Sequence, residues 1–147
     1  MSHRLDADAI YRRIPHAGAM RLLDEVVFWD GKAIVCLATS HMDRDNPLRE
    51  RGALSNVHAL EYAAQAVAVH ASLINGGVPL QRVYIATFRQ IDMKVDLLDR
   101  MTQGPLEIRA QVHAANAGTA NYTFTVSCAG AALACGAVTV VMPRDAQ

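Results

Sequence analysis

One segment constrains the fold of this chain more than any other, the stretch from Ser55 or Asn56 to Ile74. Residues that can cap a helix begin it, alanines give it high helix propensity, and the run Asn75-Gly76-Gly77 ends it. Apolar side chains surround the predicted helix on nearly all sides, and a helix of that kind has to be buried. We therefore expect a long helix at the centre of the molecule, with other elements packed around it.

Segments rich in β-branched and aromatic residues stand on both sides of this helix. Residues 22–29 and 33–39 flank an Asp30-Gly31 turn signal and predict a β-hairpin. Further stretches between turn signals predict long antiparallel strands over Arg82–Leu98, Leu106–Ala115, Asn121–Cys128 and Ala132–Met142. A short helix is expected over Leu5–Arg13, and a surface loop over Ser40–Arg51. This order predicts an α+β fold, a curved antiparallel sheet wrapped around one long central helix.

The composition limits the class of protein. The chain has 147 residues, of which 52% are hydrophobic, enough apolar material for a single domain spanning 1–147. Its 14 basic and 14 acidic residues balance, which argues against nucleic acid as a partner. No apolar run approaches the ~20 residues that cross a membrane, and the charged N-terminal residues do not resemble a signal peptide. We expect a cytoplasmic protein that binds neither nucleic acid nor membrane.

The spacing of cysteine and histidine residues does not match the common metal and cofactor motifs. Cys36, Cys128 and Cys135 lie in apolar surroundings without a CxxC pair, which predicts buried free thiols. The chain contains no HExxH motif and no glycine-rich nucleotide loop. We therefore expect neither a metal nor another cofactor.

The predicted central helix carries a stripe of polar side chains on one face. His58, Glu61 and Gln65 have the spacing i, i+3 and i+7, and Ser72 continues the stripe. A carboxylate on a buried helix is costly unless it is paired or lies in a functional cleft, so Glu61 is the leading candidate for a catalytic residue. The alternative is a Glu61 that forms an ion pair with an arginine such as Arg89.

Two stretches of the chain resemble motifs of a known family. Residues 14–24, IPHAGAMRLLD, resemble the opening motif LPHRxPxLLVD, and residues 60–66, LEYAAQA, resemble the central-helix motif VEAMAQA of the hotdog-fold, FabZ-type 3-hydroxyacyl-ACP dehydratases. The similarity covers nearly the whole chain and is to the branch associated with aryl-polyene-type pigment pathways. It implies a hotdog fold and the dehydration of 3-hydroxyacyl thioesters carried on acyl carrier protein. It also implies that Glu61 is the catalytic carboxylate and that Gln65 supports it, although Gln65 fits a helix-surface or interface amide equally well.

Such a dehydration needs three groups: a base for the Cα proton, an acid for the departing hydroxyl, and donors for the thioester oxygen. A histidine and a carboxylate together can supply the first two. Free backbone N–H groups at the start of a buried helix, here around Asn56, Val57 and His58, can supply the third.

The histidine of the family has no counterpart at its usual place. The family carries it in an HFPGxPxxPG loop before the central helix, whereas the corresponding stretch Asn46–Ser55 is shorter and contains no histidine. His58, His41 and His16 remain as replacements, and His58 is the best placed because it lies one turn before Glu61. A core role is as plausible for His58, and a structural or surface role is expected first for His41 and His16.

The leading hypothesis is therefore a dehydratase. The alternatives are an acyl thioesterase, or a catalytically weak subunit that supports an active hotdog partner. We expect a homodimer or a mixed dimer at least, because a single chain would leave a sheet edge and a helix flank with Ala63, Ala66 and Val67 uncovered. Arginine clusters that could receive an acyl carrier protein are Arg12 with Arg13, Arg49 with Arg51, and Arg82 with Arg89.

Overall fold

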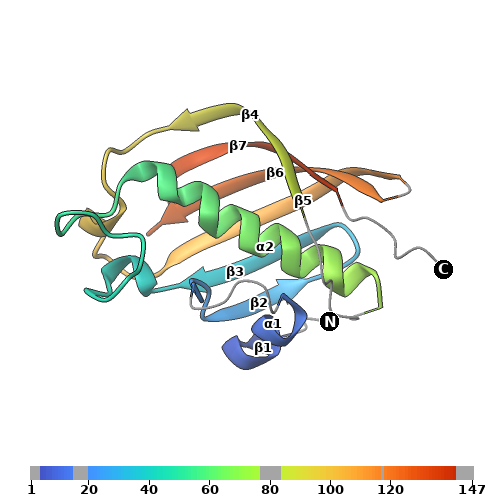
Figure 1. Cartoon of the computed structure of the whole chain (residues 1–147), viewed down its shortest axis with the longest axis horizontal. Helices are drawn as coiled ribbons and strands as arrows, with labels where there is room; N and C mark the ends of the chain where they lie inside the picture. The colour runs from blue at the N-terminus through green and yellow to red at the C-terminus, as the bar shows by residue number, and fades with distance from the viewer. Residues whose placement is uncertain (1–3, 15–19, 77–83, 117, 142–147) are drawn as a thin grey trace.

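The computed structural model describes residues 4–14, 20–76, 84–116 and 118–141 (Figure 1). In this part of the chain the strands form one antiparallel sheet with the order β1-β2-β3-β5-β6-β7-β4. The strands are β1 (Leu5–Asp6), β2 (Glu25–Trp29), β3 (Ala33–Ala38), β4 (Tyr84–Met93), β5 (Leu106–Asn116), β6 (Thr119–Cys128) and β7 (Ala131–Val141). The helices are α1 (Ala7–Arg13) and α2 (Ala59–Ile74), with 3-10 turns at Ser40–Met42, Asn56–His58 and Leu98–Arg100.

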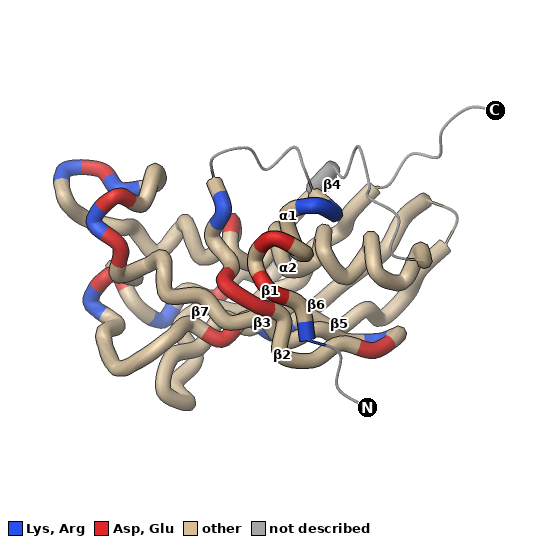
Figure 2. The backbone as a smooth tube through the Cα atoms, turned by 90° about the horizontal axis from the view of Figure 1, so that it is seen from below, with Lys and Arg blue, Asp and Glu red and all other residues tan. Residues whose placement is uncertain are grey.

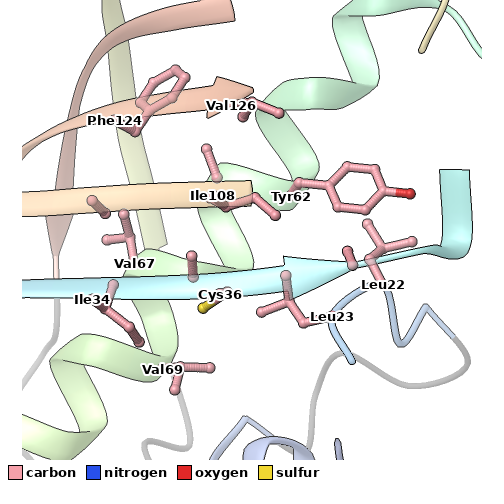
Figure 3. Close-up of a cluster of buried hydrophobic side chains, with 14 of the residues drawn as sticks. Leu22, Leu23, Ile34, Cys36, Tyr62, Val67, Val69, Ile108, Phe124 and Val126 are labelled. Carbon is pink, nitrogen blue, oxygen red and sulfur yellow. The ribbon is translucent and has the colours of Figure 1, made fainter. Parts of the chain in front are cut away.

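Helix α2 lies across one face of the sheet, over β3, β5 and β6 (Figure 1). Its side chains Tyr62, Val67 and Val69 are fully buried. Figure 3 shows them among apolar side chains of the sheet, including Ile34 and Ile108. Burying an aliphatic side chain of this size contributes about 1.5–3 kcal/mol relative to leaving it exposed, so this contact is the main source of stability. The hotdog fold predicted from the sequence is confirmed.

The predicted hairpin, central helix and long strands are confirmed in position. The first helix begins at Ala7, because the carboxylate of Asp6 accepts a hydrogen bond from Ala9 N–H at 2.9 Å and caps it. The strand predicted over Arg82–Leu98 ends at Met93 among the described residues. There the chain turns back toward the start of α2.

Three details differ from the expectations. The helix flank with Ala63, Ala66 and Val67 is fully buried in the single chain, because the small side chains let the helix lie close to the sheet. The segment 40–51 was predicted to be a surface loop, yet His41 and Asn46 within it are buried. All three cysteines are free as predicted, but one of them, Cys135, is only half-buried because it faces away from α2.

A glycine in β7 is required by close packing. A Cβ atom on Gly136 would lie 2.4 Å from Ile91 Cδ1, 3.2 Å from the Arg89 carbonyl oxygen and 3.3 Å from Phe124 Cε1. We expect Gly136→Ala to lower the free energy of unfolding by about 1–3 kcal/mol, the usual cost of overpacking a core. Urea unfolding monitored by circular dichroism measures the change. Gly31→Ala is the matched control, because a Cβ at Gly31 meets nothing within 4 Å; an equal loss in both variants would contradict this account.

Candidate active site

The residues just before α2 are anchored to the segment that follows β4. Hydrogen bonds from both backbone and side-chain groups join residues 54–56 to residues 95–99. They are Leu54 N–H to Asp99 Oδ1 (3.2 Å), Leu98 N–H to Leu54 C=O (2.9 Å), Asn56 N–H to Asp96 C=O (2.9 Å) and Asn56 Nδ2 to Val95 C=O (2.7 Å). The position of the first helical turn, and of the polar side chains on it, follows from these bonds.

Glu61 is exposed and His58 is half-buried in the single chain. No ion pair of Glu61 is found among the described residues. Arg89, the alternative partner, instead donates from Nη2 to Thr139 Oγ1 at 3.4 Å. The expectation that Glu61 is buried within this chain is therefore wrong, because the elements that cover this face of α2 begin only one turn later.

The surface around Glu61 is apolar. Val57, one turn before it, is 50% exposed, and the neighbouring Leu60 and Ala64 are half-buried. An apolar surface that covered this turn would remove water from around the carboxylate. The start of α2 thus presents an exposed carboxylate that is surrounded by apolar side chains and is not covered by any other part of the described chain.

Gln65 holds the N-terminal segment onto α2. Its Oε1 accepts hydrogen bonds from Tyr11 Oη–H at 2.6 Å and from Leu22 N–H at 3.3 Å, and its Nε2 donates to Met20 C=O at 2.8 Å. Burial raises the pKa of Tyr11 to about 12, so this phenol stays protonated and donates. No hydrogen bond between Gln65 and Glu61 is found among the described residues. Gln65 is an anchor for residues 11 and 20–22, and its predicted role beside the substrate stays a prediction.

The backbone N–H groups of the first turn are largely engaged. Asn56 N–H donates to Asp96 C=O at 2.9 Å, and His58 N–H to Ser55 C=O at 3.2 Å. The expectation of free donors is wrong for these two groups, because the 3-10 turn and the neighbouring segment satisfy them. Val57 N–H donates to Ser55 Oγ at 3.4 Å, a long and weak bond. Val57 N–H is therefore the donor of this turn that could most easily exchange its present acceptor, Ser55 Oγ, for an atom of a ligand.

The other two candidate histidines are His16 and His41. His16 lies outside the described residues. His41 is fully buried, and its Nε2 lies 2.6 Å from Met101 C=O. Because a carbonyl only accepts, Nε2 carries the proton and Nδ1 is the unprotonated nitrogen. That Nδ1 is buried with no hydrogen-bond partner in the described part of the chain. Complete burial favours a structural role for His41 over contact with a substrate.

His70, on the sheet-facing side of α2, is hydrogen-bonded through both ring nitrogens. Its Nε2 donates to Asp30 C=O at 2.8 Å, and its Nδ1 accepts from Tyr122 Oη–H at 2.6 Å. The ring also makes an edge contact with Tyr122, 5.5 Å between centroids. His70 thus fastens α2 to the β2–β3 turn. In the sequence, only the position of His70 on the face of the helix opposite Glu61 could have indicated that it packs against the sheet.

The buried histidines predict how stability depends on pH. Burial lowers the pKa of His41 and of His70 below the ordinary value of 6.5. The unfolded chain therefore binds protons more readily, so stability is complete above about pH 6.5 and falls as the pH drops through the lowered values. We expect urea midpoints to decrease below pH 6.5.

A substitution tests the contribution of His41 to this dependence. His41→Gln should flatten part of the pH dependence, because its amide can still donate to Met101 C=O but does not titrate. His113→Gln is the control, since His113 is exposed. An unchanged pH dependence in His41→Gln would refute the assignment.

The described residues contain no group of three or more metal-ligating side chains. No helix in that part of the chain is long and apolar enough to span a membrane.

Fold and site together define a class of protein. A long helix lies across an antiparallel sheet, as in the hotdog fold, with an exposed carboxylate, Glu61, on its first turn and a histidine, His58, at its N-cap. A family model of the ApeP dehydratase, ApeP-like, matches residues 9–147. The chain belongs to this family of dehydratases. The dehydration of 3-hydroxyacyl thioesters, predicted from the resemblance, is thereby confirmed as its function.

Solved structures show the same fold. A chain of the dehydratase heterocomplex ApeI:P from Xenorhabdus doucetiae is 23% identical, with a TM-score of 0.80, covering 96% of this chain and 93% of that chain. The Escherichia coli PaaI protein from the phenylacetic acid degradation operon is 18% identical, with a TM-score of 0.62, covering 92% and 93%. A PaaI mutant from Thermus thermophilus is 21% identical, with a TM-score of 0.59, covering 88% and 99%. At these identities the likeness concerns the fold alone. A comparison with curated proteins finds no match.

Proposed function

We propose that this chain dehydrates 3-hydroxyacyl groups carried on acyl carrier protein, with Glu61 and His58 as the acid–base pair. The observation that carries the proposal is the exposed start of α2, where Glu61 lies on the first turn and His58, three positions earlier, is the N-cap residue. The apolar side chains of Val57, Leu60 and Ala64 surround them. Elsewhere the helix is buried or anchors neighbouring segments. The first turn is the part of α2 that a substrate can reach.

The chemistry requires one proton to be removed and another to be supplied. One member of the pair takes the Cα proton, and the electrons of the broken Cα–H bond form the new C2=C3 double bond. The other protonates the 3-hydroxyl as the C3–O bond breaks, and water leaves. Negative charge that develops on the thioester oxygen needs a donor, and Val57 N–H is the weakly held one at this turn. Asn56, which was predicted to bind the substrate, anchors this turn in the proposal, because its side-chain amide donates to Val95 C=O at 2.7 Å.

A second hotdog subunit completes the site in this proposal. The exposed Val57 and half-buried Leu60 and Ala64 offer an apolar surface around Glu61 that a partner can cover. The similar structure from Xenorhabdus doucetiae is a heterocomplex, which supports a mixed pair over an isolated chain. Covering the carboxylate would also create the water-poor site in which acid–base groups act.

We expect association and activity to be lost together. Light scattering of the active species should give a mass above the 15.9 kDa of one chain. Val57→Lys places a charge on the exposed apolar surface and should shift the protein toward monomers with a parallel loss of turnover. Arg44→Lys, a change on an exposed loop residue, is the control. A stable and fully active monomer would contradict the composite site.

The acyl carrier protein is the predicted source of the substrate. Of the arginine clusters, Arg12 is exposed, and Arg13 is half-buried with Nη1 bonded to Ala9 C=O at 2.7 Å. Arg49 is bonded within its own loop, and Arg82 lies outside the described residues. Arg51 and Arg89 are exposed as well, so Arg12, Arg51 and Arg89 are the basic side chains of these clusters that are best placed to meet an acidic partner.

A panel of carrier-bound substrates tests the proposal. The assembled protein is incubated with 3-hydroxyacyl, enoyl and saturated acyl carriers, and the acyl chains are followed by mass spectrometry. We expect the 3-hydroxyacyl chain to lose water and the saturated chain to stay attached. Loss of the acyl group would indicate a thioesterase. No change in any chain, with or without a hotdog partner, would indicate a non-catalytic subunit.

A further inference from the structure

The loop before α2 is organised by one arginine. Arg49 Nε donates to Asp43 C=O at 2.7 Å, and Nη2 donates to His41 C=O at 3.1 Å. Nη1 donates to Gly52 C=O at 3.2 Å and to Asp99 Oδ2 at 3.0 Å. A single guanidinium thus joins several points of the loop to the segment after β4. Figure 2 shows charged residues of both signs gathered at this end of the molecule.

Asp99 connects this arginine to the start of the helix. While Oδ2 accepts from Arg49, Oδ1 accepts from Leu54 N–H at 3.2 Å. The two side chains are only 15% and 16% exposed, so the ion pair is screened much less than one on the open surface. Burial alone would raise the pKa of Asp99, but the hydrogen bonds from Leu54 and Arg49 outweigh it and hold the pKa below its ordinary value. The carboxylate is therefore charged and holds both groups at neutral pH.

Arg49 lies in the stretch Asn46–Ser55, which corresponds to the histidine loop of the dehydratases that the chain resembles, and Asp99 lies in the segment after β4. We propose that Arg49 and Asp99 are positioning residues for the reaction, fixing Leu54 and thereby the turn that carries His58 and Glu61. The inference rests on the proposed function of that turn. Neither side chain needs to touch the substrate. Acid–base groups misplaced by about 1 Å can lose on the order of 10²-fold in rate, so a loosened helix start would lower turnover.

Two substitutions weaken the pair without removing bulk. Asp99→Asn keeps an oxygen that accepts from Leu54 N–H. It removes the negative charge and places an NH2 group, which is a donor, against the donor Nη1 of Arg49. Arg49→Lys keeps the charge but cannot span the carbonyl oxygens that the guanidinium reaches. We expect each variant to lower kcat at least ~10-fold while KM for the carrier-bound substrate stays within ~2-fold. If Asp99→Asn does not fold, Arg49→Lys decides the question.

Two control variants separate positioning from charge loss. Glu107→Gln breaks a 2.6 Å ion pair with Arg109 on the outer face of the sheet, and Arg44→Gln removes an exposed arginine from the same loop as Arg49. Both controls should keep the wild-type kcat and KM.

Hydrogen exchange provides a readout that does not depend on chemistry. Amides 54–58 of the assembled protein should exchange faster in Asp99→Asn and Arg49→Lys than in the wild type or the controls. Faster exchange with unchanged kcat would overturn the proposal, since the pair would then only stabilise the loop. A lower kcat without faster exchange would overturn it as well. Failure of the proposed function is seen separately, as an inactive wild type or an active Glu61→Gln variant.

Discussion

Glu61→Gln is expected to abolish turnover and to leave the fold intact. The amide has nearly the same shape but cannot take up or supply the proton that dehydration requires. Because Glu61 is exposed in the single chain, the free energy of unfolding of the variant should differ from that of the wild type by no more than about 0.5 kcal/mol. Turnover of a 3-hydroxyacyl carrier by the assembled protein, together with urea unfolding of the variant, measures both effects.

The matched control is Glu107→Gln, which makes the same chemical change on the outer face of the sheet. It should keep the activity of the wild type. An active Glu61→Gln protein would remove the catalytic assignment of this carboxylate.

His58→Ala is expected to lower turnover by about 10²–10⁴-fold, the range typical of a positioned acid–base group. The loss should be at least as large as in His41→Ala or His16→Ala. His41→Ala should instead lower stability by about 1–3 kcal/mol, since it removes a fully buried side chain that donates a hydrogen bond to Met101 C=O. Activities are compared at a temperature at which all variants are folded.

The histidine comparison also has a result that would reassign the role. A loss smaller than ~10-fold in His58→Ala, with a larger loss in His41→Ala or His16→Ala, would move the acid–base function to that residue.

The elements of the fold were predictable because their signals are local. The Asp30-Gly31 turn, the β-branched stretches and the alanine-rich run before Ile74 each specify their own element. The side chains of the site were predictable as types and spacings. Glu61 lies on the first turn of the central helix, where the family motif placed it, and His58, chosen from its spacing to Glu61, is the N-cap residue at the start of this helix.

Their surroundings could not be predicted, because they depend on contacts between distant segments. Composition indicated that α2 is buried. The N-terminal segment does cover Gln65, but no described residue covers Glu61, which is exposed. The polar run 40–51 was predicted to be exposed, yet Arg49 satisfies enough of its carbonyl oxygens to fold it inward around His41. Long-range hydrogen bonds of this kind leave no periodic signal in the sequence.

The central claim is that the open turn of α2 performs proton abstraction and water loss. The most direct test is to give the assembled protein a 3-hydroxyacyl carrier substrate deuterated at C2 and to record the mass of the carrier-bound product. We expect an enoyl chain that has lost the 3-hydroxyl and one C2 deuterium, together one HDO, formed by the wild type and absent with Glu61→Gln. Release of an acid that retains all its deuterium would contradict the central claim.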